Sequence, residues 1–92
     1  MRTVFTLIFL SIILPIRAAY ILIPMDETQS NHLKAYGIAY WILTKEVNVD
    51  WMLNYKGGSF MVKYLQVFEN ECIIRGVSYQ VISDAEANDV FQ

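Results

Sequence analysis

A lysine, two glycines and a serine stand in a row at Lys56-Gly57-Gly58-Ser59. The backbone N–H groups of a glycine-rich loop, together with an ammonium group, can bind an anion such as a phosphate. The spacing matches neither the dinucleotide fingerprint nor the G-x-x-x-x-G-K-[ST] loop. Because a glycine pair that follows a strand is more often a plain turn, the segment is a candidate anion-binding loop with a turn as the alternative.

Two carboxylates, Asp26 and Asp84, follow other apolar runs of the sequence and complete the candidate set. In open parallel sheets, ligands bind beyond the carboxyl ends of the strands, and these ends meet at one edge. We therefore expect Asp26, Asp84 and the loop of Lys56, Gly57, Gly58 and Ser59 to lie together and to bind a small polar or anionic ligand.

His32 is the only histidine and Cys72 the only cysteine. His32 lies near the start of a predicted helix, where it is either a proton shuttle or ligand or a partly exposed helix residue. Cys72 has Glu69 and Glu71 close by in the sequence, which disfavours a thiolate, so we expect a buried and inert thiol. No metal-ligand spacing is present. We assign no metal, no cofactor and no catalytic residue.

Six elements that alternate between strand and helix are predicted along residues 20–92. Asp26 and Gln29 have the spacing of a capping box and place the start of the first helix near Glu27. The predicted elements are a strand over 20–23, a helix over about 27–45, a strand over 47–53, a helix over about 62–75 ended by Gly76, a strand over 77–82 and a helix from Ser83 or Asp84. This order predicts an α/β fold, a three-stranded parallel β-α-β-α-β-α piece of a doubly wound sheet.

The predicted first helix is apolar around nearly its whole circumference from Tyr36 to Leu43. Such a helix is typical of one covered by protein on all sides. Three short parallel strands also seldom complete a domain. We therefore expect residues 20–92 to be an incomplete, N-terminal portion of an α/β domain, with the remainder of a longer chain as its partner.

The first nineteen residues have the order of a secretory signal peptide, which we expect to form a helix. Arg2 precedes the apolar run Val4–Ile16, and Ala18-Ala19 follow. The alternative is a membrane anchor, but Pro15 and Arg17 interrupt the run. We expect an exported protein of the periplasm or cell envelope, without stable membrane insertion after cleavage.

Charge excludes a further class of partner. The chain has seven basic residues; without Arg2 and Arg17 five remain, against nine acidic ones, for a net charge of −4 over residues 20–92. Such a charge gives no attraction to nucleic acid or to an anionic membrane surface. The whole chain is 55% hydrophobic, well above the content of disordered chains, so we expect it to fold.

Several segments resemble the N-terminus of the exported Bacteroidetes proteins labelled asparagine synthetase B. The matching segments are Ile23–Gln29, Asn31–Trp41, Val49–Trp51, Asn54–Phe60, Glu71–Cys72, Ile74–Tyr79 and Val81–Ala85. The resemblance implies a longer protein whose later part is similar to glutamine-amidotransferase-like α/β domains, with its catalytic residues downstream. The expected function is that of the N-terminal fragment of such an amidotransferase-like protein. The alternative is a non-catalytic periplasmic small-ligand-binding or scaffold module.

Overall fold

The structure of this protein is a computed structural model that describes residues 18–91. In that range the chain forms four strands and three helices. In chain order they are β1 (Tyr20–Ile23), α2 (His32–Leu43), β2 (Val49–Met52), β3 (Ser59–Lys63), α3 (Gln66–Arg75), β4 (Gln80–Ile82) and α4 (Asp84–Phe91). The predicted signal-peptide helix lies outside the described residues.

The four strands form one antiparallel sheet in the order β2-β3-β1-β4. The prediction of a three-stranded parallel sheet is therefore wrong. A strand that sequence analysis missed, β3, lies between β1 and β2 and runs antiparallel to both. β1 and β2 do run in the same direction, but they are not neighbours. The order β-α-β-β-α-β with this pairing is the split βαβ arrangement of ferredoxin-like folds.

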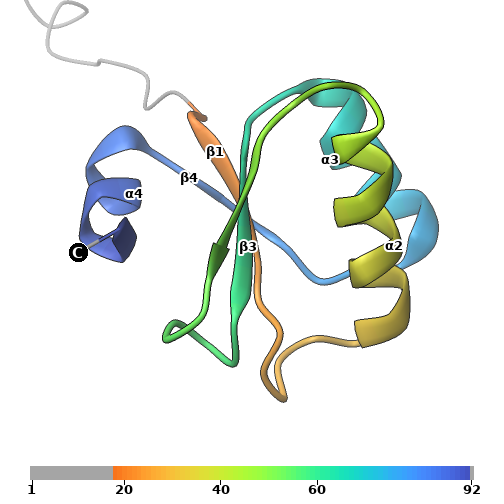
Figure 1. Cartoon of the computed structure of the whole chain (residues 1–92), viewed down its shortest axis with the longest axis horizontal. Helices are drawn as coiled ribbons and strands as arrows, with labels where there is room; N and C mark the ends of the chain where they lie inside the picture. Colours follow the sequence, from red (N-terminus) through yellow and green to blue (C-terminus); the bar gives the residue numbers. More distant parts are fainter. Residues whose placement is uncertain (1–17, 92) are drawn as a thin grey trace, which may run out of the picture.

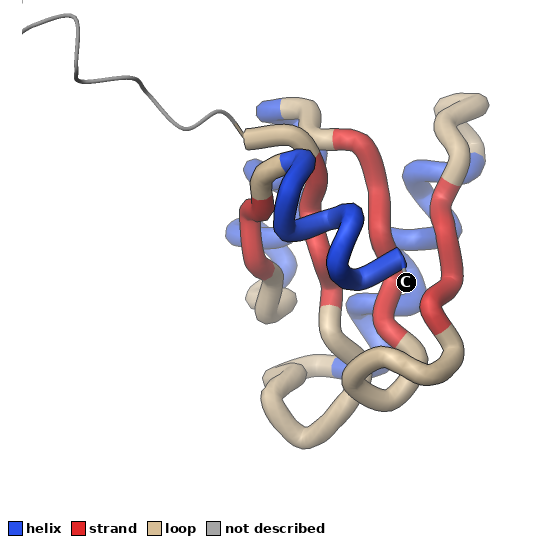
Figure 2. Tube along the Cα trace, turned by 90° about the vertical axis from the view of Figure 1, so that its left-hand side faces the viewer, coloured by secondary structure: helices blue, strands red, loops and turns tan. Residues whose placement is uncertain are grey.

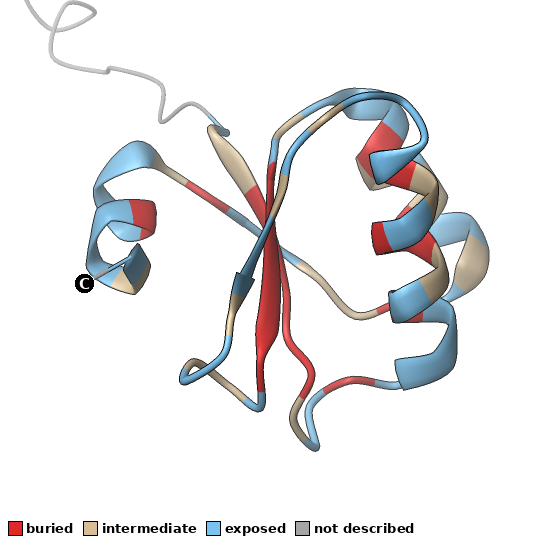
Figure 3. Ribbon diagram, in the orientation of Figure 1, coloured by how far each residue is buried: buried red, intermediate tan, exposed pale blue. Residues whose placement is uncertain are grey.

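Two layers of core lie on opposite faces of the sheet. Figure 1 shows α2 and α3 on one face and α4 on the other. The β1 strand is buried on both faces because its side chains alternate: Ile21 and Ile23 pack with α2 and α3, whereas Leu22 packs with Met61 and the helix α4. Figure 3 shows these buried segments along β1 and β3 and on the inner sides of the helices.

The third helix, α4, covers the second face only in part. Figure 2 shows it lying across the middle of the sheet. Its buried residue, Ala87, packs against Leu22, Met61 and Ile82, and Val90 is only partly buried there. Within residues 18–91, none of the helices has the length and apolar character needed to span a bilayer.

The ends of the helices show which local signals were correct. Helix α2 begins at His32, not near Glu27, because the Asn31 side chain accepts the Lys34 N–H at 3.1 Å and caps it. Gly76 ends α3 with a φ of 70°, as predicted. Before α4, the Ser83 hydroxyl accepts the Glu86 N–H at 3.3 Å and the Glu86 carboxylate accepts the Ser83 N–H at 3.2 Å, which completes a capping box.

The start of one helix and the start of one strand also differ from the prediction. The second predicted helix begins at Gln66 instead of about residue 62, because Val62 and Lys63 belong to β3. The last strand begins at Gln80 instead of residue 77, since Val77 and Ser78 form a connection that contacts the loop after β1. Each shift follows from a pairing between segments that are distant in the sequence.

Candidate functional site

The loops that follow β1 and β2 meet at the carboxyl ends of these strands, because the two strands run in the same direction. The Met25 N–H donates to the Lys56 carbonyl at 3.1 Å. A Cβ atom at Gly57 would lie 2.9 Å from both the Asp26 nitrogen and the Met25 oxygen. The structure therefore brings together Asp26, Lys56 and Gly57, as the sequence analysis predicts.

Most of the polar groups in this loop pair are hydrogen-bonded within the loops. The N–H groups of Gly58 and Ser59 both donate to the Tyr55 carbonyl, at 3.1 and 2.9 Å. The buried Ser59 hydroxyl donates to the same carbonyl at 2.8 Å. Donors that an anion would need are thus used inside the turn. This geometry favours a turn, and the anion site stays a prediction.

The Asp26 carboxylate is also occupied locally. It accepts the hydroxyl of Thr28 at 2.5 Å and the N–H of Thr28 at 3.0 Å. These bonds, with a smaller contribution from the Lys56 ammonium, lower the pKa of Asp26 below its ordinary value. The Asp26 side chain is an ionised acceptor that shapes its own loop.

Positive φ angles explain why glycines occupy the hairpin. Lys56, Gly57 and Gly58 have φ angles of 45°, 73° and 90°, a region that glycine adopts without steric cost. The Gly58 carbonyl accepts the indole N–H of Trp51 at 3.0 Å. The pair of glycines therefore lets the hairpin turn back sharply and approach the loop after β1.

Asp84 does not join these candidates. Strand β4 runs antiparallel to β1, with Ile82 opposite Tyr20. Asp84 therefore lies near the beginning of β1, whereas Asp26 follows the end of that strand. Asp84 is the exposed first residue of α4. The expectation of a common edge depended on a parallel sheet.

His32 and Cys72 take structural positions. The His32 Nε2 atom lies 2.9 Å from the Asp26 carbonyl and 3.1 Å from the Met25 carbonyl, so it holds the loop after β1 as a donor. Burial, followed by the charges of Glu69 and Glu71, raises the pKa of the Cys72 thiol to about 11. Within residues 18–91, His, Cys, Asp and Glu side chains form no group of three that could hold a metal ion.

Sequence analysis missed a carboxylate that joins three elements. The Glu69 carboxylate accepts the hydroxyls of Tyr64 at 2.7 Å and Tyr79 at 2.8 Å. These bonds lower the pKa of Glu69, whereas burial and then the bond to Glu69 raise the pKa of Tyr79 to about 12. The three residues follow no local spacing rule, because Tyr64 comes directly after β3, Glu69 belongs to α3 and Tyr79 comes directly before β4.

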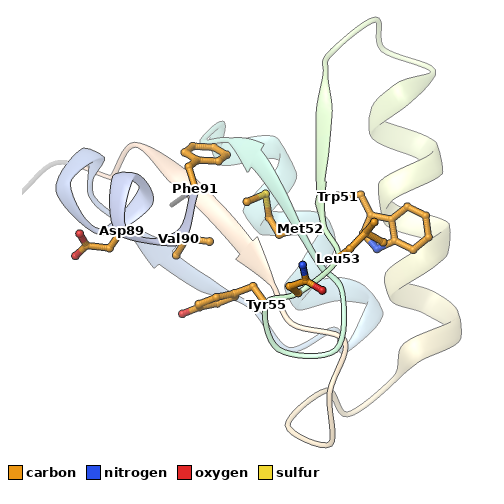
Figure 4. A pocket seen from close by; sticks show the side chains of 8 residues that line it. Trp51, Met52, Leu53, Tyr55, Asp89, Val90 and Phe91 are labelled. Atoms are coloured by element: carbon orange, nitrogen blue, oxygen red, sulfur yellow. The ribbon is translucent and has the colours of Figure 1, made fainter.

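A cavity of about 360 Å³ lies between α4 and the β2–β3 hairpin (Figure 4). Its lining residues are Trp51, Met52, Leu53, Asn54, Tyr55, Asp89, Val90 and Phe91. In Figure 4 the Asp89 carboxylate points away from Met52 and Phe91. The lining mixes apolar side chains with the polar side chains of Asn54, Tyr55 and Asp89.

A second groove, of about 270 Å³, lies between α2 and the outer strand β2. We call it the α2–β2 face and define it by its lining residues, Tyr36, Ala39, Tyr40, Leu43, Trp51 and Phe60. Tyr40 is 71% exposed and Trp51 59% exposed. The apolar run Tyr36–Leu43 is thus explained by two faces of one helix: Ile38 and Ile42 are buried against the sheet, and the tyrosines are exposed.

Aromatic contacts hold the α2–β2 face in shape. The Phe60 ring meets Tyr36 edge to face, with 5.7 Å between ring centroids, and stacks on Trp51 at 6.2 Å. The indole N–H of Trp51 is fixed by the Gly58 carbonyl. Three of the four aromatic rings of the face, those of Tyr36, Trp51 and Phe60, are therefore in contact through Phe60.

No model of a protein family, no curated protein and no solved structure matches this chain.

Proposed function

We propose that residues 20–91 act as a non-catalytic scaffold module that contacts protein through the α2–β2 face. The observation that carries this proposal is the exposed aromatic groove. The largest exposed apolar patch on a monomeric protein measures about 300–600 Å² and is often functional. Tyrosine and tryptophan are also enriched in the centres of protein interfaces.

The rigidity of the face supports a binding role. Binding costs less conformational entropy when the contacting side chains are already ordered. The Phe60 ring contacts both Tyr36 and Trp51, and the Trp51 indole also donates a hydrogen bond to the Gly58 carbonyl. A partner would therefore meet a surface that needs little rearrangement.

The strand-end loops give less support to small-ligand binding. The N–H groups of Gly58 and Ser59 donate to Tyr55, and the Asp26 carboxylate accepts from Thr28. Cys72, the cysteine of the chain, is buried and protonated at neutral pH. The amidotransferase-like assignment depends on downstream residues that the resemblance implies, and it stays a prediction.

Export is part of the same proposal. It rests on the order of Arg2, the apolar run Val4–Ile16 and the small pair Ala18-Ala19. With a C-terminal tag in a Gram-negative host, the protein should be found in the periplasm, shortened by about 18–19 residues. Full-length protein in the cytosol would contradict export and leave the contact surface untouched.

Hydroxyl-radical footprinting tests whether the α2–β2 face is covered. The oxidation rates of Tyr40 and Trp51 are compared between intact cells that make the protein and purified protein at high dilution. We expect both residues to be protected in cells. Phe91, which is 43% exposed and lies outside the face, serves as the control and should react equally in both samples. Equal rates for Tyr40 in the two samples would refute the proposed function.

A further inference from the structure

We propose that the occupant of the α2–β2 face is a second copy of this chain, bound through antiparallel pairing of the two β2 strands about a two-fold axis. The inference rests on the proposed function and names its partner. It follows from three features of the described residues: the open edge of β2, the register that this edge allows, and the exposed area beside it.

The backbone of β2 is open on its outer side. The Tyr64 N–H donates to the Ala19 carbonyl at 2.9 Å, so even-numbered residues of β3 bond to β1. Hydrogen bonds alternate along antiparallel strands, and the odd-numbered residues of β3 therefore face β2, opposite Asp50 and Met52. The backbone groups of Val49 and Trp51 consequently point outward, and β2 is the last strand of the described sheet.

A two-fold axis through Trp51, perpendicular to the sheet, gives the outward backbone groups of β2 hydrogen-bond partners. It places Trp51 opposite Trp51 of the second copy, and two outward-facing residues that stand opposite each other exchange both hydrogen bonds. Asp50 then lies opposite Met52 of the second copy, so the two carboxylates do not face each other. Like charges directly opposite would destabilise the pair. The axis also places both α2 helices on the same side of the joined sheet.

The exposed rings of the α2–β2 face supply about half of the area that a standard interface buries on each partner. Tyr36, Tyr40 and Trp51 are 52%, 71% and 59% exposed. For aromatic residues that bury about 150–250 Å² each, these fractions leave roughly 300–450 Å² available. A standard interface buries about 800 Å² per partner. Leu43, Leu53 and the β2 backbone lie beside these rings and add to the area.

The composition of the face also fits contact with a copy of itself. Its lining residues are all uncharged, and homodimer interfaces are more apolar than other protein interfaces. A two-fold interface uses the same patch on both copies, so the aromatic face of one copy meets an aromatic face. No complementary charge on a foreign protein is needed.

Analytical ultracentrifugation of the 92-residue chain across about 1–200 μM, a range set to bracket micromolar association, tests the inference. We expect a monomer–dimer equilibrium. Tyr40→Lys should raise its dissociation constant at least ~10-fold, because a charge would be placed in the apolar contact. The matched control is Ile74→Lys, which changes a 74% exposed residue of α3 outside the face and should leave the constant within about two-fold. Both positions are exposed, so both variants should keep the wild-type circular dichroism spectrum.

Hydrogen exchange of the backbone amides tests the pairing itself. The Trp51 amide should be protected at concentrations where the chain is dimeric and should exchange faster on dilution. A dimer whose Trp51 amide exchanges freely, or one that Tyr40→Lys does not weaken, would overturn the inference. A purely monomeric chain would also overturn it. If footprinting still showed a covered face in cells, the proposed function would stand with another occupant.

Discussion

Replacing Gly57 with alanine should destabilise the fold by about 1.5–3.5 kcal/mol, for two separable reasons. The φ angle of 73° is in the left-handed region, where a residue with a Cβ atom costs about 1–2 kcal/mol. The new Cβ would also lie 2.9 Å from the backbone of Met25 and Asp26. The two loops would have to separate, and the bond from Met25 to Lys56, worth about 0.5–1.5 kcal/mol, would be strained or lost.

Gly76→Ala is the matched control, because it isolates the first of these terms. Gly76 has a similar φ of 70°, and a Cβ atom there would have open space around it. Urea denaturation followed by circular dichroism gives the free energy of unfolding for both variants. We expect Gly76→Ala to lose about 1–2 kcal/mol and Gly57→Ala distinctly more. A loss at Gly57 no larger than that at Gly76 would show that the two loops do not press together in solution.

Three further substitutions test other contacts. Ser83→Ala removes the hydroxyl of the capping box and should cost about 1 kcal/mol in urea denaturation; an unchanged midpoint would mean that α4 contributes little to folding. The raised pKa of Tyr79 favours its neutral phenol in the folded state, so the associated stability is complete below pH 10, the ordinary pKa, and is lost as the pH rises towards 12. Stability measured against pH should therefore be flatter in that window for Tyr79→Phe, and an unaltered slope would contradict the raised pKa of Tyr79. Lys56→Met should leave inorganic phosphate binding unchanged in calorimetry, because the N–H groups of Gly58 and Ser59 are already used; a weakening of about 10-fold, equivalent to about 1.4 kcal/mol, would establish the anion site.

A wrong strand direction in the predicted sheet also misplaces a candidate site residue. Asp26 and Lys56 were predicted to meet, and they do, because β1 and β2 run in the same direction even though β3 separates them. Asp84 was placed with them on the assumption that β4 was parallel to β1. The antiparallel pairing of β4 moves Asp84 to the opposite edge. The aromatic groove is not predicted: the apolar run Tyr36–Leu43 indicates a helix covered on all sides, whereas its tyrosines are exposed. The sequence alone does not say which rings lie beside β2.

Short-range chemistry in the sequence determined several elements of this protein. The buried strand β1 follows from four consecutive β-favouring residues, the end of α3 from Gly76, and the start of α4 from the Ser83 to Glu86 spacing. Each signal involves residues that are close to each other in the sequence, so the physical cause is local. A local signal can also mislead, as the Asp26 to Gln29 spacing did: the Gln29 side chain instead donates to the Ser78 carbonyl, 49 positions away.

Only the tertiary structure decided that Ser59–Lys63 is a strand and that it lies inside the sheet. A short apolar run of this kind fits a strand or the beginning of a helix equally well, because periodicity does not separate the two. Pairing with β1 on one side and β2 on the other buries Phe60, Met61 and Val62 and satisfies the backbone. The partners in β1 lie 37 to 43 residues away in the chain, and those in β2 lie 7 to 13 residues away. Sheet order, the meeting of the two loops and the open edge of β2 all follow from that one non-local pairing.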